Sequence, residues 1–211
     1  ALNIEVTQTQ NLLCHGDSSG SFQLQAMGGT GTINYTLGTE TNTTGIFENL
    51  NANTYNITVT DDNDCTSFIE VELSEPAILE ITNSQTTTVN CFGENNGSID
   101  LNASGGVGIL TFSLDNETNA TGIFENLEAN LYTISIVDEN GCNTSIEINI
   151  TEPTVLTAEI LQTNPINCAG GNNGTVQFGA NGGAGNYQFS MAGITNPTGL
   201  FENLAADDYL M

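Results

Sequence analysis

Apolar and polar residues alternate along short stretches of this chain, and runs of turn-forming residues separate the stretches. In the sequence SIDLNA, the apolar residues Ile99, Leu101 and Ala103 alternate with polar ones. The same alternation recurs at Leu110, Phe112 and Leu114, at Tyr132, Ile134 and Ile136, and at Ile146, Ile148 and Ile150. A period of two on short segments predicts half-buried β-strands and no helices, which is typical of a β-sandwich.

The whole pattern returns at a fixed offset of 77 in residue number. The stretch Thr44–Tyr55 recurs as Thr121–Tyr132 and again as Thr198–Tyr209. The same offset links Cys14 with Cys91 and Cys168, Cys65 with Cys142, and the glycine pairs at 28–29, 105–106 and 182–183. A period without drift indicates one structural module copied in tandem. We therefore predict repeats at 1–76, 77–153 and 154–211, the last of them incomplete because its final strands are missing.

Successive repeats are joined by the dipeptides Glu75-Pro76 and Glu152-Pro153. Proline fixes its own φ and biases the preceding residue towards extended geometry, so these junctions are expected to be short and stiff. Together with the sandwich pattern this predicts all-β, tandem β-sandwich domains that form an elongated rod. Because the third repeat stops early, we expect the sequence to be a window from a longer repeat chain.

The charge of the chain is extremely one-sided. It has no Lys or Arg and 25 Asp plus Glu, for a formal net charge of −25. Such a surface repels phosphate backbones and anionic lipids, which argues against nucleic acid as a partner and against direct membrane insertion. It attracts divalent cations instead.

The five cysteines fall two to each complete repeat, with Cys168 left over. Pairing Cys14 with Cys65, and Cys91 with Cys142, would close loops of about 50 residues, worth roughly 4 kcal/mol in the chain-entropy model. Pairing Cys65 with Cys91 across the junction is the alternative. We predict the pairing within each repeat, with Cys168 unpaired, and hence an oxidising, extracellular environment.

Several motifs recur in a set order. A Cys-x-Gly turn is followed by Asn-Gly or Ser-Gly, the glycine pair, F-x-N-L-x-A-x-x-Y, and D-x-N-G-C at Asp138–Cys142. This order resembles the SprB repeat, which occurs in giant cell-surface adhesins of gliding bacteria of the Bacteroidetes type. The resemblance implies Ig-like modules in a secreted, surface-anchored chain exported by the type IX route. It implies no catalytic residues.

Acidic turns precede the second cysteine of each complete repeat. Asp61, Asp62 and Asp64 cluster before Cys65, and Asp138 with Glu139 occupies the equivalent turn. Oxygen-rich loops near a junction could hold Ca²⁺ and stiffen it. The alternative is that these side chains make the turn by hydrogen bonding to their own backbone, and this alternative is favoured. No other cofactor is expected.

Asparagines in N-x-S/T sequons alternate with inward apolar residues and should face solvent. Examples are Asn56, Asn102 and Asn149. They are candidate glycosylation sites, although a surface without Lys or Arg also needs Asn and Thr for solubility. Tyr55, Tyr132 and Tyr209 recur at one position and are expected to close a corner of the sandwich through their hydroxyls.

An enzyme needs one distinct constellation of titratable groups, whereas every polar feature here is either repeated or replaced between repeats. We therefore predict a non-enzymatic, structural or adhesive segment of a long extracellular fibre or cell-surface adhesin. Its expected partners are neighbouring repeats, further copies in filaments, and surface polysaccharide. The alternative is an array of carbohydrate- or surface-binding modules, calcium-dependent or not, which would show solvent-facing aromatic residues at equivalent positions.

Overall fold

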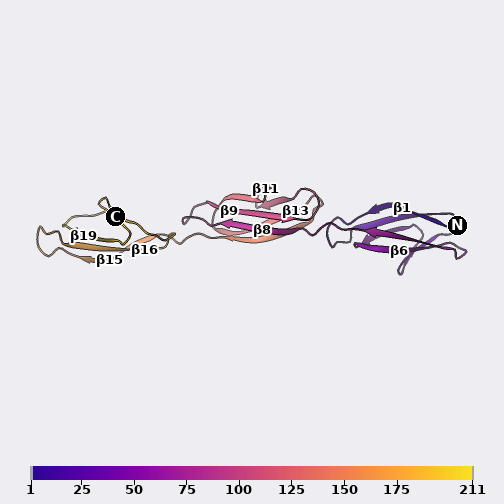
Figure 1. The fold of residues 1–211 in the computed structure, drawn as a ribbon, viewed down its shortest axis with the longest axis horizontal. Helices are drawn as coiled ribbons and strands as arrows, with labels where there is room; N and C mark the ends of the chain where they lie inside the picture. The colour runs from indigo at the N-terminus through magenta and orange to yellow at the C-terminus, as the bar shows by residue number, and fades with distance from the viewer. Residues whose placement is uncertain (1, 211) are drawn as a thin grey trace. The chain divides into compact units, whose positions relative to one another are not determined.

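The computed structural model describes residues 2–210, and within that range the chain consists of β-strands, turns and loops without a helix (Figure 1). The predicted all-β fold is confirmed. Among these residues there is also no helix long and apolar enough to cross a membrane.

The first repeat has seven strands in two sheets. They are β1 (Asn3–Gln10), β2 (Gly20–Met27), β3 (Asn34–Leu37), β4 (Glu40–Asn42), β5 (Ile46–Leu50), β6 (Asn53–Thr60) and β7 (Thr66–Leu73). One sheet has the order β1-β2-β5 and the other the order β4-β3-β6-β7. All of these pairings are antiparallel. Seven strands in sheets of three and four are the complement of an immunoglobulin-type sandwich.

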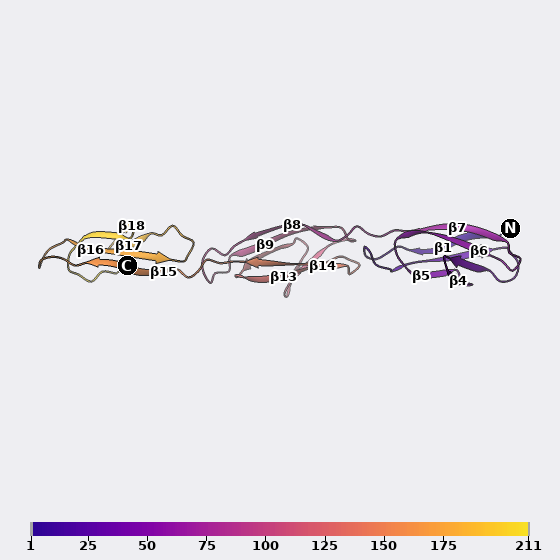
Figure 2. The same cartoon turned by 90° about the horizontal axis from the view of Figure 1, so that it is seen from below.

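The second repeat follows the same plan. Its strands are β8 (Glu80–Thr87), β9 (Gly97–Ser104), β10 (Thr111–Leu114), β11 (Glu117–Asn119), β12 (Ile123–Leu127), β13 (Asn130–Val137) and β14 (Asn143–Ile150). The sheets have the orders β12-β9-β8 and β11-β10-β13-β14. Each strand begins and ends at the same offset of 77 from its counterpart in the first repeat, so the period of the sequence is also the period of the strands (Figures 1 and 2).

The third repeat has five strands within the described residues. They are β15 (Thr157–Asn164), β16 (Gly174–Asn181), β17 (Phe189–Met191), β18 (Ile194–Asn196) and β19 (Leu200–Leu204). They form the sheets β15-β16-β19 and β17-β18. In the described part of this repeat β17 therefore pairs with β18 alone, whereas β3 pairs with both β4 and β6.

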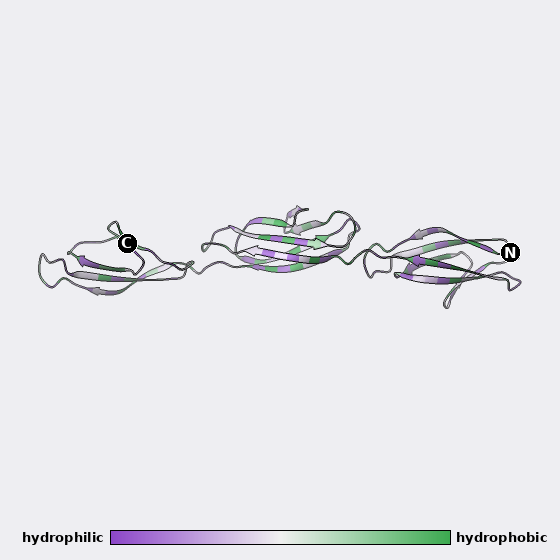
Figure 3. Cartoon of the chain, in the orientation of Figure 1, coloured by the Kyte–Doolittle hydropathy of each residue, from purple (hydrophilic) through white to green (hydrophobic). Residues whose placement is uncertain are grey.

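The core of the first repeat draws on both of its sheets, which makes the repeat a sandwich. The core residues are Leu12, Phe22, Leu24, Tyr35, Phe47, Ile57, Val59, Val71 and Leu73. In the second repeat Ile99, Leu101, Ile134 and Ile136 are fully buried at equivalent positions. Figure 3 shows hydrophobic and hydrophilic positions that alternate along the strands. In β9, for example, every second residue from Gly97 to Leu101 is buried.

The stretch that recurs most closely turns the chain into β5 and its counterparts. The Asn42 Oδ1 atom accepts hydrogen bonds from the Thr44 and Gly45 backbones at 3.0 and 2.8 Å. The Gly45 carbonyl in turn accepts one from the Leu24 backbone at 2.8 Å. Asn119 and Asn196 make the same bonds to the equivalent glycines at 2.8 and 2.7 Å. The motif is therefore repeated because each copy docks β5, β12 or β19 on its neighbouring strand.

The recurring tyrosines close a corner, as predicted. The Tyr55 hydroxyl donates to the Asn51 carbonyl at 2.9 Å. Tyr132 and Tyr209 make the equivalent bonds, to residues four positions earlier, at 3.1 and 3.3 Å. Tyr55 and Tyr132 thereby fix the loops that lead into β6 and β13, which is the role of the tyrosine corner in immunoglobulin-like sandwiches.

Backbone contacts divide the chain into two compact units, and their boundary crosses the second repeat. One unit comprises the residues up to Ser84 with Leu101–Gly122 and Thr133–Ile146, and the other Gln85–Asp100, Ile123–Tyr132 and the residues from Glu147 onward. The junction between the first and second repeats lies within the first unit. The junction between the second and third lies within the other.

Candidate functional site: the repeat junction

The glutamate of each Glu-Pro dipeptide binds the turn that carries the first cysteine of its own repeat. The Glu75 Oε2 atom accepts a hydrogen bond from the Gly16 backbone at 2.7 Å, and Glu152 Oε2 accepts one from Gly93 at 2.6 Å. Hydrogen bonds to a charged acceptor are stronger than those between neutral groups. The chain segment that leaves a repeat is therefore fastened to that repeat before the next one begins.

His15 adds a contact that exists only at the first junction. Its Nδ1 atom lies 3.2 Å from Glu75 Oε1 and 3.1 Å from the Pro76 carbonyl oxygen. Phe92 and Ala169 occupy the equivalent positions, so this interaction cannot recur. The sequence offered no signal for it, because the two residues are 60 positions apart.

The glycine pair of each following repeat receives the incoming chain. The Gly106 backbone donates to the Ala77 carbonyl at 2.9 Å, and Gly183 donates to the Thr154 carbonyl at 2.7 Å. A Cβ atom at Gly105 would overlap the carbonyl oxygen of Ile78. The pair is thus needed both for its positive φ and for the close approach of the chain that enters the repeat.

Asp61 and Asp138 are buried, and each organises the turn before a second cysteine. Asp138 Oδ1 accepts hydrogen bonds from the Asn140 and Cys142 backbones at 2.9 and 2.8 Å, and its Oδ2 accepts one from Val107 at 2.8 Å. Asp61 makes the equivalent three bonds, to Asn63, Cys65 and Thr30. The carboxylates therefore join the second-cysteine turn to the loop of the glycine pair.

These hydrogen bonds affect the titration of Asp61. The backbone N–H of Cys65 lowers the pKa of the Asp61 carboxyl, burial opposes this, and the N–H groups of Thr30 and Asn63 lower it further. The charged form is therefore the one that the folded turn stabilises.

Two of the remaining acidic residues of the predicted calcium site also accept hydrogen bonds from the backbone. Asp62 Oδ2 accepts a hydrogen bond from Thr32 at 3.0 Å, and Glu139 Oε1 accepts one from Ile109 at 3.2 Å. Asp64 has a positive φ of 61° at the end of its turn. Among residues 2–210 no group of three or more His, Cys, Asp or Glu side chains is arranged to hold a metal ion. The turn interpretation accounts for these contacts, and a calcium site stays a prediction.

The disulfide crosses the junction, which corrects the predicted pairing. Cys14 is bonded to Cys142 of the next repeat, with the two Cα atoms 5.6 Å apart. Cys65, Cys91 and Cys168 are free and exposed. The pairings Cys14–Cys65 and Cys91–Cys142 are therefore wrong in this structure, and so is the alternative Cys65–Cys91.

The direction of the last strand explains the correction. We call the end at which the chain enters a repeat its front end and the end from which it leaves its back end. Cys65 immediately precedes β7 at the front end, whereas Leu12, near Cys14, donates a hydrogen bond to the Ser74 carbonyl just after β7. A strand of eight residues spans about 25 Å, and a disulfide needs Cα atoms within about 7 Å. The two cysteines of the first repeat therefore lie at opposite ends of the sandwich.

A further contact holds the two repeats together beside the disulfide. The Asn140 side chain donates from Nδ2 to the Leu13 carbonyl oxygen at 2.9 Å. A small cavity of about 280 Å³ lies here, lined by Cys14, His15, Ile78, Leu79, Gly141, Cys142 and Asn143. The back end of the first repeat and the front end of the second are thus joined by covalent and hydrogen bonds.

The candidate glycosylation sites lie where they were expected. Asn56, Asn102 and Asn149 are exposed on strands whose neighbouring residues are buried or half-buried. Attachment of a glycan to them stays a prediction.

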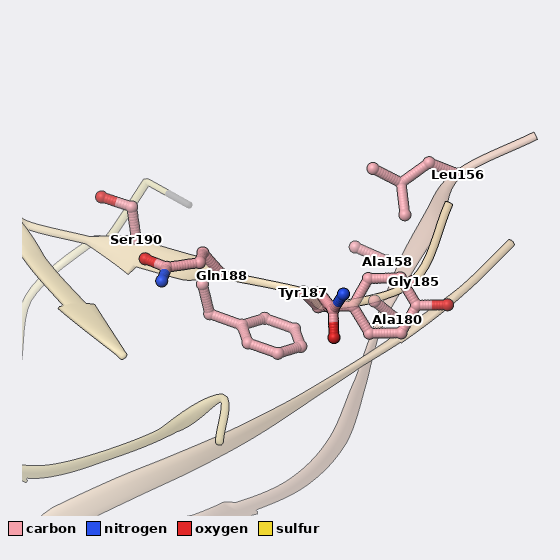
Figure 4. Close-up of a pocket in the computed structure, with 9 residues that line it drawn as sticks. Leu156, Ala158, Ala180, Gly185, Tyr187, Gln188 and Ser190 are labelled. Carbon is pink, nitrogen blue, oxygen red and sulfur yellow. The ribbon is translucent and has the colours of Figure 1, made fainter. Parts of the chain in front are cut away.

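The third repeat contains a groove of about 430 Å³ beside β17 (Figure 4). Its lining residues are Leu156, Ala158, Ala180, Gly185, Asn186, Tyr187, Gln188, Phe189 and Ser190. The Tyr187 hydroxyl donates to the Gly182 carbonyl at 2.7 Å. The counterparts of Leu156, Ala158 and Ala180 in the first repeat are Leu2, Ile4 and Ala26. These side chains pack against a core to which β6 and β7 contribute. The groove is therefore sandwich interior that these strands cover in the first repeat, and it brings no reactive groups together.

The SprB repeat family model matches residues 83–119 and 160–196. The two matched segments are separated by the same offset of 77 that the sequence shows, and they extend from β8 to β11 and from β15 to β18. The resemblance drawn from the motifs is confirmed at both positions. A comparison with curated proteins finds no match.

Among solved structures, extracellular domains 3–5 of Drosophila OTK are similar at 14% identity and a TM-score of 0.31, over 70% of this chain and 61% of that one. Domains 4–9 of the surface layer protein SbsC are similar at 13% identity and a TM-score of 0.29, over 86% of this chain and 36% of that one. Domains 1–6 of SbsC are similar at 12% identity and a TM-score of 0.29, over 97% of this chain and 36% of that one. The chain spans less than two thirds of each of these structures.

Proposed function

We propose that this chain, in which the SprB repeat model matches residues 83–119 and 160–196, is a non-enzymatic, structural or adhesive segment of a long extracellular fibre or cell-surface adhesin. In this role it transmits mechanical load and sets distance, while adhesion to a target is a property of the larger assembly. Its partners are then the neighbouring repeats, with surface polysaccharide or further copies of the chain as additional ones.

The junction is the observation that carries this proposal. The bond between Cys14 and Cys142 joins two successive repeats, and Glu75 fastens the connecting segment to the first of them. A covalent connection between modules resists extension of the segment between them, because that segment cannot be pulled out while the bond is intact. A chain of independent binding modules has no need of such a connection.

The distribution of exposed aromatic residues favours a structural role over an array of carbohydrate-binding modules. Phe68 is 73% exposed and Phe92 is 56% exposed. The residue equivalent to Phe68 in the second repeat is Ser145, and those equivalent to Phe92 are His15 and Ala169. A binding platform carried by every repeat would need such residues at recurring positions. The recurring Tyr55 and Tyr132 are instead half-buried at the corner of the sandwich.

An extracellular location agrees with this role. The SprB resemblance implies a secreted chain, and a stable disulfide requires an oxidising environment. The charge of −25 with no basic residue keeps such a surface soluble and hinders lateral aggregation.

Negative-stain electron microscopy of the chain, with millimolar calcium and with a chelator, tests the proposal. We expect thin, elongated particles of one length under both conditions. Filaments much longer than one chain would add self-assembly to the structural role, and elongation only with calcium would support a site in the acidic turns. Compact particles, or saturable binding of a defined glycan by each repeat, would contradict the structural role and favour the binding array.

A further inference from the structure

The three free cysteines occupy the same two turns as the bonded pair. The carbonyl oxygens of Cys14, Cys91 and Cys168 each accept a hydrogen bond from the backbone three residues later, at 3.4, 3.2 and 3.0 Å. Cys91 and Cys168 therefore begin the same kind of backbone turn as Cys14, and both are exposed.

The second-cysteine turns match in the same way. The Cys142 backbone donates to Asp138 Oδ1 at 2.8 Å, and the Cys65 backbone donates to Asp61 Oδ1 at 2.9 Å. Cys142 is bonded, whereas Cys65 is free and exposed. Both kinds of half-site are thus present in unbonded form elsewhere on the chain.

We propose that the junction bond is a repeating one, in which the first cysteine of a repeat bonds the second cysteine of the repeat that follows. Cys91 and Cys168 are then sites for the second cysteine of a following repeat of this kind, and Cys65 is a site for the first cysteine of a preceding one. Forming each bond removes two protons and two electrons from two thiols. A disulfide oxidant, such as oxidised glutathione or a disulfide-bonded oxidoreductase, accepts them and becomes two thiols.

Contacts at the second junction support this order of pairing, from the first cysteine of one repeat to the second cysteine of the next. Two of the hydrogen bonds beside the first junction bond have counterparts there: Glu152 holds the Cys91 turn at Gly93, and Gly183 holds the incoming Thr154. The Cys91 turn of the second repeat and the glycine-pair loop of the third therefore make the contacts that their counterparts make at the first junction. The residue equivalent to Cys142 would be number 219, which lies outside this sequence of 211 residues.

Thiol mapping of an extended chain tests the inference. The chain is lengthened by a copy of its own residues 135–153, which continue the third repeat and carry a copy of Cys142. In this copy the counterpart of Ser145 is threonine, so that the Glu-specific peptide of the appended cysteine differs in mass from that of Cys142. After refolding with oxidised and reduced glutathione, free thiols are alkylated and the protein is digested with a Glu-specific protease, since trypsin has no site. We expect Cys91 to be bonded to the appended cysteine and the free thiols to fall from three to two, Cys65 and Cys168.

Two controls make the outcome decisive. In the extended chain whose appended cysteine is replaced by serine, Cys91 should be alkylated as in the original chain. In the original chain, Cys14 and Cys142 should be recovered as one linked peptide pair. A bond from the appended cysteine to Cys168, an appended cysteine that stays free while Cys14–Cys142 forms, or a Cys14–Cys65 peptide would each overturn the inference.

The inference rests on the proposed extracellular location only for its oxidant. Since the experiment supplies glutathione, its failure would leave the structural role intact. Conversely, a negative result in the microscopy test would not affect the pairing rule.

Discussion

Asp61 and Asp138 show how a single carboxylate organises each front end. Each accepts three backbone hydrogen bonds and links a second-cysteine turn to the glycine-pair loop. Asp was recognisable in the sequence as a turn residue, but its third bond, to a backbone 31 positions away, depends on how the sandwich closes.

Acid should destabilise the first repeat through Asp61. The pKa of this carboxyl is lower in the folded chain than its ordinary value near 4. Its stabilising contribution is therefore complete above about pH 4 and lost as the pH falls through the folded pKa. Urea unfolding at pH 6, 4 and 3 should show this loss. Asp61→Asn should be less stable at pH 6 and show a smaller further loss on acidification, and an unchanged pH dependence would contradict this role.

Burial distinguishes two phenylalanines of the first repeat. Phe47 lies in the recurring stretch and is 1% exposed, whereas Phe68 on β7 is 73% exposed. Phe47→Ala should lower the free energy of unfolding by about 3–5 kcal/mol, because it leaves a cavity in the core. Phe68→Ala should change it by less than about 0.5 kcal/mol. Denaturant unfolding of both variants measures the difference, and equal effects would show that the assigned core is wrong.

At the scale of elements, the position of a cysteine relative to the last strand decides its partner. β7 runs from the front end, beside Cys65, to the back end, where Leu12 and Glu75 fasten the exit. A strand is a rigid spacer of about 3.3 Å per residue. The length of β7 therefore keeps Cys65, at the front end, apart from Cys14, at the back end.

The close approach of the incoming chain to the glycine pair predicts how substitutions at this junction affect stability. Gly105 and Gly141 both have a φ of 85°, but a Cβ atom at Gly105 would overlap Ile78 and one at Gly141 would meet nothing within 4 Å. Gly141→Ala should cost about 1–2 kcal/mol for backbone strain alone. Gly105→Ala should cost clearly more, because the incoming chain must also move. Denaturant unfolding of the two variants tests this, and a smaller cost for Gly105→Ala would contradict the close approach.

At the scale of the whole molecule, the disulfide makes the stability of one repeat depend on its neighbour. While the second repeat stays folded, unfolding the first leaves a segment of about 65 residues tethered at both ends, by Cys14 and by the chain. In the chain-entropy model, closing such a loop disfavours the unfolded state by about 4 kcal/mol. Cooperation between repeats is therefore built into the covalent structure.

This dependence can be measured. Cys142→Ser, although it lies in the second repeat, should lower the free energy of unfolding of the first repeat by up to about 4 kcal/mol, as Cys14→Ser does. Hydrogen exchange followed by mass spectrometry reports the change for each repeat separately. Cys65→Ser is the matched control and should have no effect. Loss of protection in the first repeat with Cys65→Ser, but not with Cys142→Ser, would restore the pairing within a repeat.

Most parts of the junction were visible in the sequence, but their assembly was not. The Glu-Pro dipeptides, the glycine pairs and the acidic turns all stand out because they recur with the period of the repeat. That Glu75 binds Gly16, and that Gly106 binds Ala77, follows from which loops share an end of the sandwich. The sequence did contain one clue to the cysteine pairing. If the chain enters each sandwich at the front end and leaves at the back end, the residues just before the last strand, including Cys65, must lie at the front end.

The sequence by itself determined the features that depend on local chemistry: the period of the repeat, the strands with their inward and outward faces, the tight turns and the corner tyrosines. Alternation and turn preferences act between residues close in the chain, so they can be read without a fold. Only the tertiary structure decided which cysteines meet, because two thiols bond according to their distance in space. β7 separates Cys14 from Cys65, and the junction brings Cys14 to Cys142.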